Sequence, residues 1–108
     1  MCALKGIREL CKAGAEAHAA GDALNAEFLL RQARIQAKGL NSPVLEAKIL
    51  NTMAVFALEG ARAPAAIPLL AQARDMVLTR IGHANKLYSV INSNLLQAEQ
   101  SVAAGAGR

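Results

Sequence analysis

Few side chains of this 108-residue chain could take part in catalysis or metal binding. Neither histidine, His18 nor His83, has Cys, Asp or Glu at ligand spacing. On a helix, His18 would lie about 10 Å beyond Cys11, too far for both to chelate one metal. Glu9 and Glu16 share a predicted helix face with basic residues, which is typical of a solvated helix. The sequence therefore predicts no enzyme activity, no metal site and no cofactor.

The two cysteines and the N-terminal charges bear on the cellular compartment. Cys2 and Cys11 would lie on opposite sides of one helix, about 13 Å apart along its axis, too far for a disulfide. Two unpaired thiols favour a reducing compartment. Lys5 and Arg8 interrupt any N-terminal segment of signal-peptide type, and no apolar stretch is long enough to span a membrane. We expect a cytoplasmic protein that does not bind membranes.

The charges are dispersed along the chain. The formal net charge is +4, without a run of like charges and without a basic stretch interleaved with aromatic residues. Nucleic-acid-binding proteins usually carry a denser basic patch. We therefore expect a slightly basic, solvated surface and no nucleic-acid partner.

The composition predicts a single all-α domain. The hydrophobic fraction of 54% excludes an intrinsically disordered chain. The sequence has 24 alanines but only three aromatic residues. Alanine has the best helix propensity, whereas the aromatic residues favoured in strands are scarce. A chain of this length is large enough for one core but not for two.

Segments rich in glycine and proline divide the chain into five stretches. Apolar residues recur at steps of three and four in each stretch, which predicts five helices with one apolar stripe each. Asp22 is suited to cap the second helix and Pro43 to begin the third. Pro68 would crowd the preceding turn, so we expect the fourth helix to begin late or irregularly. The predicted helices, with neighbours antiparallel, cover residues 3–20, 23–38, 43–59, 65–81 and 85–103.

The chain also matches itself. Residues 29–34 (Leu-Leu-Arg-Gln-Ala-Arg) match residues 69–74 (Leu-Leu-Ala-Gln-Ala-Arg) after a shift of 40, and a further step of 41 relates Asn51 to Asn92. Such a period indicates stacked helical units, none of which can bury its apolar face alone. Arg34 and Arg74 are expected to form a solvated ridge or to pair with nearby carboxylates. The residues that we expect at buried positions or close helix contacts are Leu10, Gly14, Leu30, Leu50, Ala54, Leu70, Ile91 and Leu95.

The order of large and small residues within each unit resembles the tetratricopeptide pattern. The residues that match in the first unit are Leu10, Ala13, Gly14, Ala17, Ala26, Leu30 and Ala33. The period of 40 makes the chain similar to the longer variety found in kinesin light chains and many bacterial regulators. Ala17 and Ala57 replace a bulky residue of that pattern, and Leu30 and Leu70 replace an aromatic one. The resemblance implies an α-α superhelix with repeats at about 4–39 and 43–82 and a closing helix at about 85–103.

In this family the first helices of successive units line a concave groove, and groove asparagines often clamp the backbone of a bound peptide. An amide side chain suits that role because it donates and accepts hydrogen bonds. Neighbouring basic residues can pair with ligand carboxylates. The alternative is that these are ordinary polar residues on an exposed face. The groove residues that the resemblance implies are Arg8, Lys12, His18, Lys48, Asn51, Thr52, Asn92 and Ser93.

The resemblance therefore implies a non-catalytic module that binds a peptide or protein segment, acidic in character, in a mildly basic groove. A self-associating module is the first alternative, because two and a half units leave ends that another copy could cover in a homodimer. A small-molecule-sensing domain is the second, and it would need a buried pocket with converging polar groups.

Overall fold

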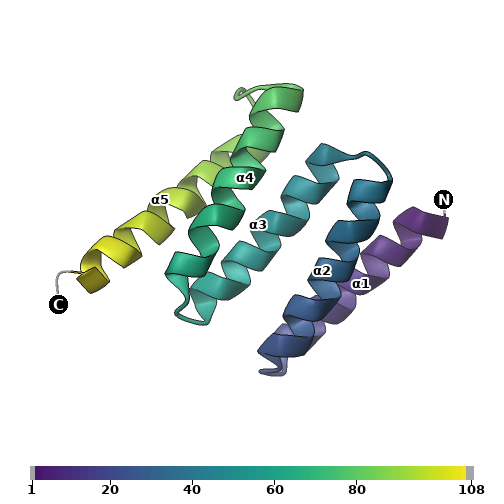
Figure 1. The fold of residues 1–108 in the computed structure, drawn as a ribbon, viewed down its shortest axis with the longest axis horizontal. Helices are drawn as coiled ribbons and strands as arrows, with labels where there is room; N and C mark the ends of the chain where they lie inside the picture. The colour runs from purple at the N-terminus through teal and green to yellow at the C-terminus, as the bar shows by residue number, and fades with distance from the viewer. Residues whose placement is uncertain (1, 107–108) are drawn as a thin grey trace.

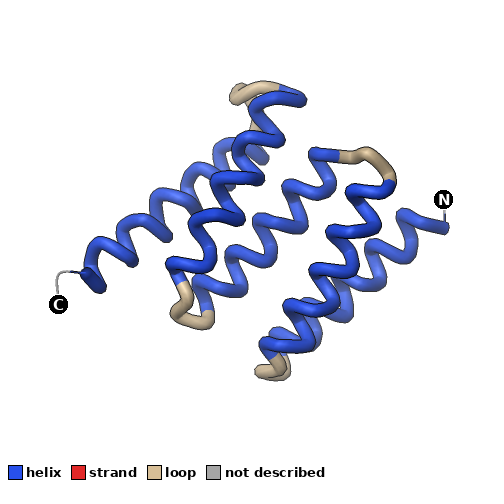
Figure 2. Tube along the Cα trace, in the orientation of Figure 1, coloured by secondary structure: helices blue, strands red, loops and turns tan. Residues whose placement is uncertain are grey.

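Five α-helices make up most of the protein. The computed structural model describes residues 2–106, in which the helices are α1 (Cys2–Ala19), α2 (Ala23–Gly39), α3 (Pro43–Glu59), α4 (Ala63–Ile81) and α5 (Lys86–Ala106). Short loops join them, and successive helices run antiparallel (Figures 1 and 2). Residues 2–106 contain no strand. The predicted all-α class and the five predicted helices are confirmed.

The helices end at the predicted segments rich in glycine and proline, but the predicted start of the fourth helix is not confirmed. Gly21 adopts a φ of 84° two residues after the end of α1, a conformation that glycine accepts without strain. The Asp22 carboxylate then caps α2 by accepting a hydrogen bond from the amide of Asn25 at 3.2 Å. The predicted late start of the fourth helix is wrong, because α4 begins at Ala63 and continues through Pro68. Pro68 is exposed, so water can reach the carbonyl group that lacks a partner at this turn.

The helices form two hairpins and a closing helix. The most extensive contacts are those of α1 with α2, of α3 with α4 and of α4 with α5. The contact between α2 and α3, which we call the hairpin joint, is the smallest between successive helices. In Figure 1, α1 lies behind α2 and α5 lies behind α4. The resulting molecule is flat, with extents of 49 × 35 × 18 Å.

The core consists of leucines and isoleucines separated by alanines. Leu30, Leu50, Leu70 and Ile91 are fully buried, and Leu95 is nearly so, as the repeat predicts. The small side chains between them let the helices approach closely. Seven alanines of this core have no exposed surface: Ala33, Ala37, Ala47, Ala54, Ala66, Ala73 and Ala98.

The first helix departs from the predicted core in one position. Leu10 is only partly buried, and Ile7, which is 1% exposed, takes the deep position on α1 instead. The reason is that α1 packs mainly on α2, so part of its apolar stripe stays uncovered. The close contact expected at Gly14 is confirmed, because a Cβ atom there would lie 3.1 Å from Cγ of Leu30.

One ion pair crosses the hairpin joint. The Nε of Arg34 on α2 donates to Oε2 of Glu46 on α3 at 3.1 Å, and Glu46 is buried. In the second unit, Arg74 pairs with its neighbour Asp75 at 3.3 Å. Both arginines of the repeated segment therefore pair with carboxylates, one of the two outcomes that the sequence predicts.

Candidate functional site

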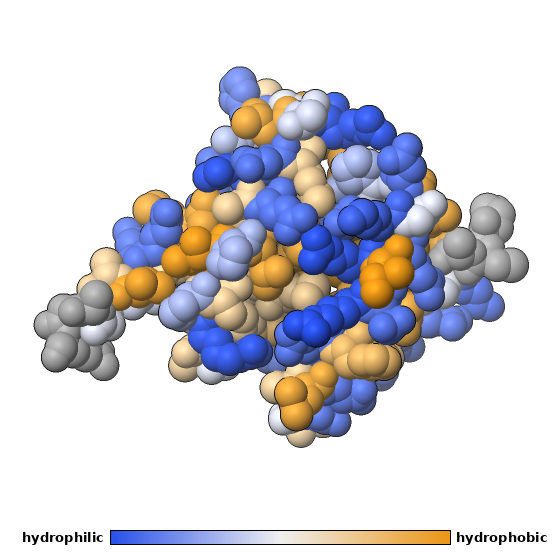
Figure 3. Space-filling view, viewed as in Figure 1, coloured by the Kyte–Doolittle hydropathy of each residue, from blue (hydrophilic) through white to orange (hydrophobic). Residues whose placement is uncertain are grey.

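A groove of about 630 Å³ lies between α2 and α4, and α3 forms its floor. We call it the α2–α4 groove. The second helix contributes residues from Ala23 to Lys38, which span about 22 Å of its axis, whereas Arg62 and the first two turns of α4, as far as Leu69, form the other side. In the surface view of this face, hydrophilic side chains surround a central area in which apolar atoms show (Figure 3). The small hairpin joint leaves this space open between the second helices of the two hairpins.

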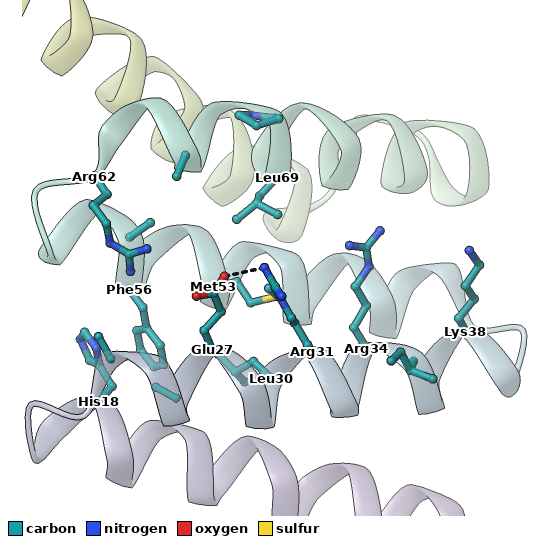
Figure 4. Close-up of a pocket in the computed structure, with 16 residues that line it drawn as sticks. His18, Glu27, Leu30, Arg31, Arg34, Lys38, Met53, Phe56, Arg62 and Leu69 are labelled. Atoms are coloured by element: carbon teal, nitrogen blue, oxygen red, sulfur yellow. Dashed lines mark hydrogen bonds and ion pairs between the residues drawn. The ribbon is translucent and has the colours of Figure 1, made fainter.

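The floor of the groove is apolar. Leu30 of α2, Met53 and Phe56 of α3 and Leu69 of α4 meet there (Figure 4). Met53 is 9% exposed and Phe56 and Leu69 are half-buried, so each keeps some surface that a ligand could cover. Covering this surface would favour binding by about 25 cal/mol per Å² of apolar area removed from water.

Four cations line the groove: Arg31, Arg34 and Lys38 of α2 and Arg62, which directly precedes α4. Arg31 pairs with Glu27 at 2.7 Å, and Arg34 forms the ion pair across the hairpin joint. No ion pair found within the described part of the chain includes Lys38 or Arg62. These two lie near opposite ends of the groove (Figure 4). Since Glu27 is the one acidic residue among the described lining residues, the groove is positively charged.

His18 closes the end of the groove that contains Arg62. Its Nε2 lies 2.7 Å from Oε1 of Glu59, and its ring stacks on Phe56 with 3.9 Å between ring centroids and 7° between planes. These contacts tie α1 to α3. His18 is the one sequence-predicted site residue that lies in the α2–α4 groove.

The two predicted groove asparagines do not lie side by side. The Nδ2 of Asn94 on α5 donates to Oδ1 of Asn51 on α3 at 2.9 Å. Asn92 lies about 200° around the α5 axis from Asn94 and is exposed beside Arg74 of α4. The expected alignment of Asn51 with Asn92 is therefore wrong. The physical reason is that α5 packs mainly on α4, which turns Asn94, and not Asn92, toward α3.

The remaining predicted residues lie on α1, α3 and α5. Arg8, Lys12 and Lys48 are exposed on α1 and α3, and Ser93 lies beside Asn92 on α5. The hydroxyl group of Thr52 donates to the carbonyl oxygen of Lys48 at 3.1 Å, a bond within α3 itself. The grouping of these residues into one groove stays a prediction.

Sequence reasoning missed three of the groove cations, Arg31, Lys38 and Arg62. A partial signal was available, because Arg31, Arg34 and Lys38 are spaced by three and four and so share one face of α2. Arg62 lies in the loop before α4, where no periodicity exists. Nothing in the sequence shows that α4 brings it opposite the basic face of α2.

Reactive groups are scarce in the described part of the structure. Burial raises the pKa of the half-buried Cys11 thiol, so less of the nucleophilic thiolate is present at neutral pH. The side chain of Cys2 lies outside the described part. Within that part, no group of three or more His, Cys, Asp or Glu residues could hold a metal ion. None of the helices described is both long and apolar enough to traverse a membrane.

Comparisons with known proteins do not assign this chain to a family. No family model, no curated protein and no solved structure matches this chain. The resemblance to tetratricopeptide repeats therefore stays a prediction. The α2–α4 groove, with its apolar floor and its cations, is the candidate functional site.

Proposed function

We propose that the protein is a non-catalytic interaction module that binds an acidic segment of another protein in the α2–α4 groove. The observation that supports this most directly is an apolar floor between Arg62 at one end and Lys38 at the other. Carboxylates of a ligand would pair with these cations, while its apolar side chains cover Met53 and Leu69. The proposal keeps the kind of function that the tetratricopeptide resemblance implies. It places the binding surface on α2, α3 and α4 instead of α1, α3 and α5.

Charge reversal in the groove tests this proposal. Peptides that bind the immobilised protein would be selected from a random display library, and their affinities measured by fluorescence anisotropy. Lys38→Glu combined with Arg62→Glu should weaken binding at least tenfold, about 1.4 kcal/mol, because two attractions become repulsions. Binding to the wild-type protein should also weaken as salt rises, since exposed charges are screened within about 10 Å at 0.1 M.

A second double variant provides the matched control. Lys12→Glu with Lys48→Glu changes the net charge equally, but on the exposed surfaces of α1 and α3 that sequence reasoning favours. It should alter the affinity less than about threefold, through long-range charge alone. A loss of affinity equal to that of the groove variant would argue against the α2–α4 groove as the binding site. A library that yields no binder would argue against the proposed function itself.

Self-association is a second candidate, favoured by an apolar stripe on α2. Leu24, Phe28 and Ile35 are 82%, 58% and 62% exposed, and their spacing places them on one helix face turned away from the core. Light scattering over a range of concentrations should then detect a homodimer, and Phe28→Glu should convert it to a monomer. A wild-type protein that stays monomeric at every concentration would remove this candidate.

A further inference from the structure

We infer that the segment bound in the α2–α4 groove is an amphipathic α-helix with acidic residues near both of its ends. The inference rests on the proposed function and adds the conformation and the residue pattern of the ligand. It follows from three properties of the groove: its hydrogen-bonding groups, its length and the positions of its cations.

The groove offers little to an extended backbone. Its described lining residues include no Asn or Gln, and its walls are helices in which most backbone groups bond within each helix, except the carbonyl group that Pro68 leaves without a partner. The described chain has no strand edge to which a peptide could add. Asn51, the expected peptide clamp, is instead bonded to Asn94. An extended peptide would therefore place unpaired N–H and C=O groups over an apolar floor, which is costly, whereas a helix pairs them internally.

The length of the groove suits a short helix. The stretch of α2 from Ala23 to Lys38 spans about 22 Å, which corresponds to about four helical turns. The floor residues Leu30, Met53 and Leu69 lie near the middle of this length (Figure 4). A ligand helix with apolar residues at positions i, i+4, i+7 and i+11 would direct one continuous stripe onto this floor.

The cations determine where the ligand is acidic. Arg62 lies at one end of the groove and Lys38 at the other, so carboxylates near both ends of the helix would meet positive charge. A second copy of this chain matches the groove poorly, because its 12 Lys and Arg residues outnumber its 8 Asp and Glu residues. The charge balance therefore favours a different, acidic partner over a homodimer in this groove.

The peptides selected from the display library, synthesised individually, are the probes for this inference. We expect apolar residues at helical spacing, acidic residues toward both ends and no proline in the centre. Circular dichroism should show helix content rising on binding. Proline at a central, non-apolar position of such a peptide should weaken binding at least tenfold, because it breaks the helix. Serine at the same position is the control and should weaken binding less than about threefold.

Methyl NMR of the wild-type protein locates the bound peptide. The Met53 methyl signal should shift, because Met53 lies in the floor, whereas that of Met76, which does not line the groove, should stay unchanged. Peptides that tolerate proline but still depend on Lys38 and Arg62 would overturn the helical ligand and leave the proposed function in place. Peptides that shift Met76 alone, or that ignore the reversal of Lys38 and Arg62, would overturn both.

Discussion

Leu70→Ala is expected to lower the free energy of unfolding by about 2–5 kcal/mol. Leu70 has no exposed surface, and it lies in the core of leucines and isoleucines that alanines separate. Because an alanine methyl group cannot reach into the space that the leucine vacates, we expect a cavity that closes only in part. Its repeat counterpart Leu50 is equally buried, so Leu50→Ala should cost a similar amount. Urea denaturation followed by circular dichroism measures both.

An exposed leucine on the same helix provides the control. Leu78 is 44% exposed, so Leu78→Ala leaves no enclosed cavity and should change the stability by less than about 1 kcal/mol. If Leu70→Ala and Leu50→Ala unfolded at the same urea concentration as the wild-type protein, the burial that follows from the 40-residue repeat would be wrong.

Gly14→Leu is expected to destabilise the protein by overpacking the contact between α1 and α2. A Cβ atom at Gly14 would lie 3.1 Å from Cγ and 3.3 Å from Cδ2 of Leu30, and 3.5 Å from the carbonyl oxygen of Ala26. The further atoms of a leucine would have to displace the fully buried Leu30. We expect a cost of about 1–3 kcal/mol, enough to exceed the gain of nearly 1 kcal/mol in helix propensity.

Gly39, at the end of α2, allows a matched comparison. A Cβ atom there would meet no atom within 4 Å, and the backbone does not adopt a positive φ. Gly39→Leu should therefore leave the stability unchanged or raise it slightly. Thermal melts of the two variants would separate packing from propensity. A Gly14→Leu protein that melts no lower than the Gly39→Leu protein would show that α1 and α2 are not closely packed at Gly14.

Local features of the chain predict most of the fold. The spacing of apolar residues, the Gly21 turn and the Asp22 cap each act within a few residues, so a single sequence suffices to place the helices. Two predictions about the fold are wrong, the late start of the fourth helix and the deep burial of Leu10, and both depend on tertiary surroundings. Pro68 is tolerated within α4 because that turn faces water, and Leu10 stays partly open because α1 packs mainly on α2 alone.

The candidate site could not be predicted in the same way. Periodicity shows which face of a helix is apolar, but it does not give the rotation of one helix against the next. Asn51 and Asn92 are equivalent in the repeat, yet α5 turns Asn94 toward α3. The α2–α4 groove depends further on the distance between two helices that are not neighbours in the chain. Of the features of this groove, only the basic face of α2 could be recognised in the sequence, from the spacing of Arg31 and Lys38.

The small hairpin joint has a consequence for the cooperativity of unfolding. Helices α1 and α2 contact each other far more than they contact α3, so the first hairpin can open as a unit while α3, α4 and α5 stay folded. Its amide protons would then exchange with solvent sooner than those of the second hairpin. A ligand that contacts both α2 and α4 binds only the closed form, in which the first hairpin is packed against α3. Occupancy of the groove would therefore slow exchange throughout the first hairpin, including α1, which contributes only His18 to the groove.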